Sequence, residues 1–211
     1  MPHNSDRSNG DVIAALLGNP STPATLRSRL WEQNKNALDK MGRYLQDANL
    51  RMALAFNPNV AEAERNRYFQ DLIATGGNVW DKLAKNPQTP PEILEELLKQ
   101  GKEKSNIASN PSTPEVLLKC IADNYDYLWR NLAENPSTPV DLLFRFINET
   151  RETQDWSNPP IFNLVINNPN LPPVDRYRLL LEKEEAEINA KANKLMLHRR
   201  NNPYDWGQKT S

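Results

Sequence analysis

The sequence has little of the chemistry from which enzymes and metal sites are commonly built. It contains one cysteine, Cys120, and two histidines, His3 and His198. A single cysteine excludes an internal disulfide, a zinc ribbon and a cysteine-held cluster. Two histidines, both near the chain ends, leave almost nothing for a hydrolase triad or a histidine-rich metal site. We therefore expect a protein that is not an enzyme and that holds no metal and no cofactor.

Long hydrophobic runs and an excess of one charge are also missing. No apolar run approaches the roughly 18 residues that a membrane span needs, and residues 1–10 lack the apolar core of a secretory signal. The 26 Lys and Arg residues nearly balance the 27 Asp and Glu residues, so the net charge is −1. Nothing at this level draws the chain to nucleic acid or to an anionic membrane. We expect a cytoplasmic protein with no membrane contact.

Glycine is scarce, whereas proline is frequent. The 211 residues include 7 glycines and 17 prolines. Many prolines with few glycines indicate many short stops between stiff elements and few turns with positive φ, which argues against a β-sandwich or a β-barrel.

The dipeptide Asn-Pro recurs six times in a shared context. The gaps between successive anchor asparagines are 38, 29, 24, 25 and 33 residues, and the two tightest gaps predict a repeat of about 24 residues. The anchors are Asn19, Asn57, Asn86, Asn110, Asn135 and Asn168.

Apolar residues occupy fixed positions on both sides of each anchor. They recur at spacings of four and five, which predicts two amphipathic helices per repeat. Three residues before the anchors stand Leu16, Leu54, Leu83, Ile107, Leu132 and Val165. Eleven residues after the anchors stand Leu30, Tyr68, Leu97, Ile121, Phe146 and Leu179.

The turn between the two helices has its own pattern. The residue before a proline avoids the α region, so the first helix should end near the anchor asparagine. In four repeats a threonine follows three residues later and precedes a proline, which predicts a threonine N-cap worth about 1 kcal/mol and a proline at the first helical position. Glu92 would complete a capping box. The anchor asparagines themselves should form a structural hydrogen-bonded ladder, since buried turns need their backbone groups satisfied. The threonines are Thr22, Thr89, Thr113 and Thr138.

This pattern resembles the leucine-rich repeat variant family, which is mostly bacterial. LAKNPQTPPEILEELL, IASNPSTPEVLLKCI and LAENPSTPVDLLFRFI match its signature closely, and the resemblance covers about residues 12–181. It implies an all-α fold: a right-handed α-solenoid of about six helix-pair repeats, similar in architecture to ARM and HEAT proteins. Some members carry a cysteine cluster for an iron–sulfur centre ahead of the repeats. This sequence has no N-terminal cysteine, so that cofactor is not implied here.

The organisation along the chain follows from the repeat. We expect a disordered tail over 1–10, the solenoid over 11–181, a capping helix extension over 182–200 and a flexible tail over 201–211. Two inserts interrupt the solenoid: 34–49, which is an extra helix or a decayed repeat, and 148–160, which is interpreted as a loop.

A column of arginines is the candidate binding surface. Position ten after the anchor lies about 130° from the buried stripe of the second helix. It carries four arginines in six repeats, which suit contacts with carboxylates at an interface. A solvated face that keeps the array in solution is the alternative interpretation. Trp156, outside the repeat pattern, is a further candidate contact. The column's arginines are Arg29, Arg67, Arg145 and Arg178.

Trp80, Trp129 and Phe162 share a second column, six residues before their anchors, where core packing is expected and an aromatic groove edge is the alternative. These features together predict a non-catalytic protein–protein interaction module or scaffold, which docks a partner with an acidic surface on its stacked second helices. The rival hypothesis is a nucleic-acid-binding or DNA-modifying helical-repeat protein, using pairs such as Trp80 and Asp81. We do not expect nucleic acid as a partner; the partner's identity and self-association stay open.

Overall fold

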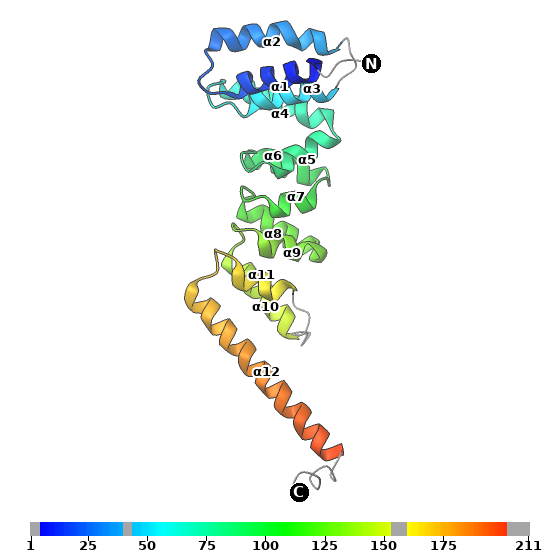
Figure 1. The fold of residues 1–211 in the computed structure, drawn as a ribbon, viewed down its shortest axis with the longest axis vertical. Coiled ribbons are helices and arrows are strands. Elements are labelled where there is room, and N and C mark those ends of the chain that lie inside the picture. Colours follow the sequence, from blue (N-terminus) through cyan, green and yellow to red (C-terminus); the bar gives the residue numbers. More distant parts are fainter. Residues whose placement is uncertain (1–4, 40–43, 153–159, 202–211) are drawn as a thin grey trace. The chain divides into compact units, whose positions relative to one another are not determined.

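The computed structural model describes residues 5–39, 44–152 and 160–201, and within these ranges the chain is entirely helical (Figure 1). It forms twelve α-helices and one short 3₁₀-helix in the described ranges, with no β-strand. The helices are α1 Ser5–Gly18, α2 Ala24–Asp39, α3 Tyr44–Ala55, α4 Glu62–Thr75, α5 Asn78–Lys85, α6 Pro91–Lys99, α7 Lys104–Ser109, α8 Glu115–Asn124, η1 Asp126–Leu128, α9 Trp129–Glu134, α10 Val140–Glu152, α11 Pro160–Asn167 and α12 Pro173–Asn201.

The chain divides into two compact units, and each is described by itself. The N-terminal unit spans Met1–Ile121 and the C-terminal unit spans Ala122–Ser211. In the N-terminal unit α3 packs against α1, α2 and α4, and α5 packs against α4, α6 and α7. In the C-terminal unit α11 packs against α9, α10 and α12. Consecutive helices thus pack in the manner of a repeat.

The predicted apolar columns form the core. Leu54, Leu83, Ile107, Leu132 and Val165, each three residues before its anchor, are all buried. In the first repeat the equivalent Leu16 is 37% exposed. The column eleven residues after the anchor is buried from the second repeat to the sixth. The helix faces predicted from the sequence are therefore confirmed, and these apolar side chains supply the main driving force for folding.

The six Asn-Pro turns share one hydrogen-bond pattern. In each, the backbone N–H three residues after the anchor donates to the anchor's carbonyl oxygen, at 3.0–3.2 Å. The anchor's side-chain oxygen accepts the backbone N–H two residues later, at 2.8–2.9 Å. This side-chain turn favours asparagine at the anchor. Its amide oxygen gives a partner to the backbone N–H two residues later, which no helix or strand satisfies in the turn.

The asparagine side chains also join successive repeats. Asn110 donates from Nδ2 to the carbonyl oxygens of Ala84, at 2.7 Å, and Asn86, at 2.9 Å. Asn57 and Asn168 reach the equivalent carbonyls of the repeats before them. All three side chains are almost fully buried. The predicted ladder is therefore confirmed at these three junctions, and it satisfies buried backbone carbonyls that helix ends leave without a partner.

The threonines act differently from the N-caps that the sequence predicted. Thr89 donates its hydroxyl to the carbonyl oxygen of Leu83, six residues back, and Thr113 and Thr138 do the same with Ile107 and Leu132. The N-cap of α6 is Pro90, which makes no side-chain cap bond, so Thr89 and Glu92 form no capping box. The threonine hydroxyl is a second donor to a carbonyl that also accepts the N–H of the anchor asparagine, and it holds the turn against the end of the preceding helix.

Several predicted boundaries change. The expected tail over 1–10 is wrong for its second half, because α1 already begins at Ser5. Within the insert 34–49, α2 continues to Asp39 and α3 starts at Tyr44, so the insert lengthens two repeat helices. Within 148–160, which was interpreted as a loop, α10 continues to Glu152 and α11 begins at Pro160.

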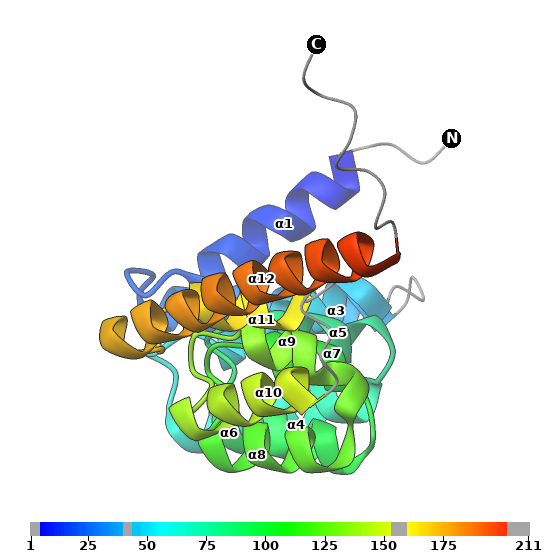
Figure 2. The ribbon, with the colours of Figure 1, turned by 90° about the horizontal axis from the view of Figure 1, so that it is seen from below.

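The C-terminal helix agrees with the prediction of a helical extension. α12 runs without interruption from Pro173 to Asn201, through the whole of the predicted segment 182–200 (Figure 2). Most of the expected tail over 201–211 lies outside the described residues.

Candidate functional site

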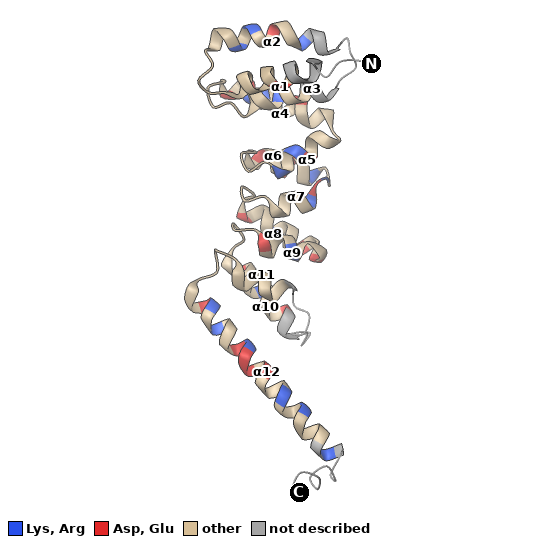
Figure 3. Ribbon diagram, in the orientation of Figure 1, with Lys and Arg blue, Asp and Glu red and all other residues tan. Residues whose placement is uncertain are grey.

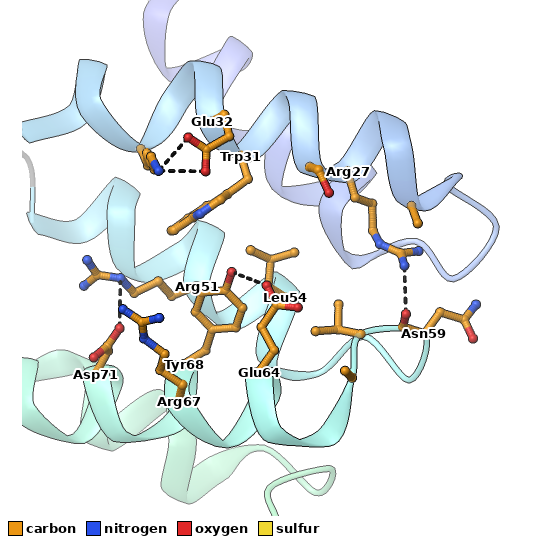
Figure 4. A pocket seen from close by; sticks show the side chains of 15 residues that line it. Arg27, Trp31, Glu32, Arg51, Leu54, Asn59, Glu64, Arg67, Tyr68 and Asp71 are labelled. Carbon is orange, nitrogen blue, oxygen red and sulfur yellow. Dashed lines mark hydrogen bonds and ion pairs between the residues drawn. The ribbon is translucent and has the colours of Figure 1, made fainter.

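A cleft of about 560 Å³ opens in the N-terminal unit between α2 and α4, with α3 behind it (Figure 4). α2 and α4 are the second helices of the first two repeats. α3 packs against both of them, and α4 presents to the cleft one face of the helix, residues 61, 64, 67, 68 and 71. The cleft therefore lies on the type of surface that the sequence singled out, the face built from second helices.

Two aromatic rings line the middle of the cleft. Trp31 of α2 and Tyr68 of α4 meet edge to face, with ring centroids 5.5 Å apart. Leu54 of α3 lies beside them (Figure 4). Trp31 is half-buried, whereas Tyr68 is 7% exposed. The indole thus offers apolar surface to a ligand, while the phenol ring belongs to the packed wall.

Arg27 closes one end of the cleft by joining two turns. It is 8% exposed, and it donates from Nη1 to the carbonyl oxygen of Thr22, at 2.7 Å, and from Nη2 to that of Asn59, at 2.8 Å. These carbonyls belong to the turns of the first and second repeats. A buried guanidinium held by backbone oxygens is fixed in place, so Arg27 shapes the cleft as a rigid positive group.

Most other charges of the cleft have partners. Lys35 pairs with Glu32 at 2.6 Å, and Arg51 lies 4.0 Å from Asp71. Arg67 is different: it is exposed, it lines the cleft, and it forms no ion pair with any residue that the structure describes. The lining includes four basic and three acidic side chains, so Arg67 is the basic group most available to an acidic ligand.

The acidic wall of the cleft is held by a tyrosine. The hydroxyl of Tyr68 donates to Oε1 of Glu64 at 3.0 Å. Burial, and after it this hydrogen bond and the carboxylate charge, raise the pKa of Tyr68 well above its ordinary value. The phenol thus keeps its proton and acts as a donor that holds the carboxylate of the exposed Glu64 against the wall of the cleft.

The predicted arginines have different surroundings. Arg67 lines the cleft, whereas Arg29, also exposed, lies on α2 outside the lining. In the C-terminal unit Arg145 pairs with Asp123 at 2.5 Å and lies over the ring of Trp129, with its guanidinium carbon 5.4 Å from the centroid.

Arg178, the fourth member of the column, lies 3.5 Å from Asp175 of its own helix. Trp156 falls in 153–159, outside the described residues. Of the predicted partner-binding residues, Arg67 lines the cleft between α2 and α4.

Sequence reasoning missed the role of a second arginine column, eight residues after the anchor. There Arg27, Arg65 and Arg176 replace the leucines of the other three repeats. Arg176 donates from Nη2 to the carbonyl oxygens of Asn168, at 2.9 Å, and Leu171, at 3.2 Å, which are in its own turn. The sequence did contain an indication of this role. The same position carries leucine in the other repeats and is buried there, and an arginine at a buried position needs hydrogen-bond acceptors such as backbone carbonyls.

The tryptophan column six residues before the anchor is structural. Trp80 donates from Nε1 to the carbonyl oxygen of Ile73, at 2.7 Å, and Trp129 donates to that of Ala122, at 3.0 Å. Asp81, the neighbour that a nucleic-acid enzyme would use, pairs with Lys85 at 2.6 Å. Since these groups are already engaged in local contacts, the column supports packing over a groove edge.

The described residues contain no group of three His, Cys, Asp or Glu residues placed to hold a metal ion. Across the same ranges, no helix is both long and apolar enough to cross a lipid bilayer.

The fold and its turns define a helical repeat protein in which each repeat is a helix, an Asn-Pro turn and a second helix. Residues 102–150 match the model of the Leucine Rich Repeat Variant domain, which confirms over that segment the resemblance drawn from the sequence. No curated protein and no solved structure shows significant similarity to the chain.

Proposed function

We propose that the protein is a non-catalytic interaction module and that a protein partner docks in the cleft between α2 and α4. One observation carries this proposal: Arg67 is exposed inside a cleft whose neighbouring cations, Lys35 and Arg51, already face carboxylates. An arginine in this position binds a carboxylate through two parallel hydrogen bonds, and the field is strengthened by the partly enclosed site.

The lining also indicates the shape of the ligand. The cleft runs along two helices and offers Trp31 as an apolar surface beside Arg67. An extended peptide segment that carries a carboxylate and, next to it, an apolar side chain fits this combination. Tryptophan and arginine are also the residue types that contribute most to binding at protein interfaces.

A nucleic acid is the second candidate partner, and the charges of the cleft disfavour it. Phosphate binding relies on several unpaired cations along a continuous track. Here Glu32, Glu64 and Asp71 share the lining with the basic residues. A phosphate backbone would meet these three carboxylates, whereas an acidic peptide needs to place one carboxylate at Arg67.

We also propose that the repeats wind as a right-handed superhelix. The support is the identical turn in all six repeats and the asparagine bridge from Asn57, Asn110 and Asn168 to the preceding repeat. A bond that is repeated with the same geometry at successive junctions favours a constant rotation from one repeat to the next.

The test of docking uses peptides and two arginine variants. A display library of short random peptides is panned against the full chain, and binding of the enriched peptides is measured by fluorescence anisotropy. We expect enrichment of Asp or Glu beside an apolar residue. Arg67→Glu should weaken binding by about tenfold or more, which corresponds to about 1.4 kcal/mol.

The matched control is Arg29→Glu, which reverses the charge of an exposed arginine outside the cleft and should leave binding within about twofold, because distant surface charges are screened. Circular dichroism establishes that both variants fold. Equal loss in the two variants, or enriched peptides without acidic residues, would contradict the proposal. Tight binding of labelled DNA or RNA at about 0.1 M salt would support the nucleic-acid alternative instead.

A further inference from the structure

The last helix carries an apolar stripe that stays open to solvent. Leu181, Ile188 and Leu195 follow one another at intervals of seven residues along α12, and they are 42%, 57% and 61% exposed. Residues seven apart lie on the same face of an α-helix, with a drift of about 20° per interval. A coiled coil has two apolar positions in every seven residues, and this stripe supplies one of them, so two such helices can pack along each other through it.

The charges beside the stripe change sign along the helix (Figure 3). The acidic residues precede Ile188 along α12, and the basic residues follow it. The acidic residues are Glu184, Glu185 and Glu187, and the basic residues are Lys191, Lys194 and Arg200. All six side chains are exposed. None of them forms an ion pair with another described residue. The helix thus presents an acidic half and a basic half on either side of Ile188.

We propose that α12 of a second copy of this chain covers the stripe, with the two helices antiparallel and the two-fold axis level with Ile188. Leu181 of one helix then lies level with Leu195 of the other, because both are seven residues from the axis. Glu184 and Lys191 lie on the same flank of the stripe, four residues before the axis and three residues after it, so Glu184 of one helix lies nearly level with Lys191 of the other and beside it. The acidic half of each helix therefore lies along the basic half of its partner, twice over by symmetry.

The charge pattern selects this occupant over others. A parallel pair would place the acidic half of one helix along the acidic half of the other and the basic half along the basic half, which is unfavourable. An unrelated partner helix would need both the heptad stripe and the reversed charge order. A second copy of α12 in the antiparallel direction has both the stripe and the reversed charge order, because its sequence is the same. The inference does not depend on the cleft between α2 and α4.

Sedimentation equilibrium of the full chain tests the association. We expect a monomer–dimer equilibrium across a concentration range of about 1 to 300 μM, because association follows mass action. Ile188→Lys places two like charges at the axis and should raise the dimer dissociation constant at least tenfold. Leu197→Lys is the matched control: Leu197 is 59% exposed on the same helix, but two residues from Leu195 and therefore about 200° around the helix. It should leave the constant unchanged, and circular dichroism checks that both variants are folded.

Cross-linking tests the direction of the helices. In a background carrying Cys120→Ala, which removes the exposed native thiol, one preparation carries Leu181→Cys and another carries Leu195→Cys. A short bismaleimide should link the mixture efficiently and each preparation alone poorly. Efficient linking of each preparation alone would show a parallel pair and overturn the proposal. A monomer at all concentrations, or a dimer that Ile188→Lys leaves unchanged, would also overturn it.

Discussion

The hydroxyl of Thr113 donates to the carbonyl oxygen of Ile107, 2.6 Å away and six residues earlier in the chain. Thr89 and Leu83, and Thr138 and Leu132, form the same pair. Each carbonyl is in the last turn of a first helix and also accepts the N–H of the anchor asparagine, at 3.0–3.2 Å. The threonine therefore joins the two helices of its repeat through a bond that is buried in the turn.

Replacing this hydroxyl tests its contribution to stability. Thr113→Val keeps the shape of the side chain but removes one of the two donors to the carbonyl of Ile107, the other being the N–H of Asn110. It should lower the free energy of unfolding by about 1 kcal/mol, the net contribution of one hydrogen bond. The measurement is urea denaturation followed by circular dichroism. Thr75→Val is the control, because the exposed Thr75 hydroxyl also bonds a backbone carbonyl, that of Asp71. Water replaces that bond, so a cost as large as that of Thr113→Val would contradict our interpretation.

The asparagine bridge between repeats should be more sensitive still. Asn110→Asp keeps the oxygen that accepts the N–H of Ser112, but it turns a second oxygen toward the carbonyls of Ala84 and Asn86. We expect a loss of about 3 kcal/mol or more at neutral pH, because a buried charge replaces a donor. Asn19→Asp is the comparison, since Asn19 is exposed and its side chain acts as the acceptor for Ser21. That variant should change thermal unfolding little.

Shortening a buried leucine of either column should leave a cavity and lower the free energy of unfolding. Leu132 and Leu143 are fully buried, so Leu132→Ala or Leu143→Ala should destabilise the fold by about 2–5 kcal/mol. Val116, 76% exposed on α8, is the control position, and Val116→Ala should have an effect near zero. Unchanged unfolding of both leucine variants would mean that the helix faces are assigned wrongly.

Tyr68 predicts a pH dependence of stability at the alkaline end. Its pKa is raised in the folded protein, so the folded state holds the phenolic proton more tightly than the unfolded state does. The resulting stabilisation is complete below the unfolded pKa of about 10 and is lost as pH rises above it. The difference in unfolding free energy between the natural chain and Tyr68→Phe should therefore be constant from pH 7 to about pH 9 and shift against the natural chain above about pH 10. A flat difference across that range would contradict the raised pKa of Tyr68, which burial and then the bond to Glu64 explain.

The repeat architecture could be predicted from the sequence because each repeat carries the same anchor asparagine. Each anchor asparagine fixes the register of the apolar positions around it, and six copies make the register unambiguous. The role of Thr113 could not be predicted in the same way. A threonine before proline can bond forward to the next helix or backward to the previous one, and the direction depends on where the second helix begins, one residue after Pro114.

The candidate site was predictable only in part. The position of Arg67 on an outer face follows from helical geometry. Whether an arginine is engaged depends on its neighbours in space: Arg145 meets Asp123 and Trp129, whereas Arg67 meets an open cleft. The cleft itself depends on how α3 holds α2 and α4, which local patterns along the chain do not encode.

The bridge made by Asn110 reaches two main-chain oxygens of the preceding repeat, those of Ala84 and Asn86. These two bonds therefore do not depend on which side chains positions 84 and 86 carry. A gene encoding such a chain can gain or lose a whole repeat by duplication or deletion, and the new neighbours still offer the same carbonyls. The chain keeps the same turn six times, although the gaps between anchors vary from 24 to 38 residues. This combination is consistent with duplication of repeats followed by insertions between them.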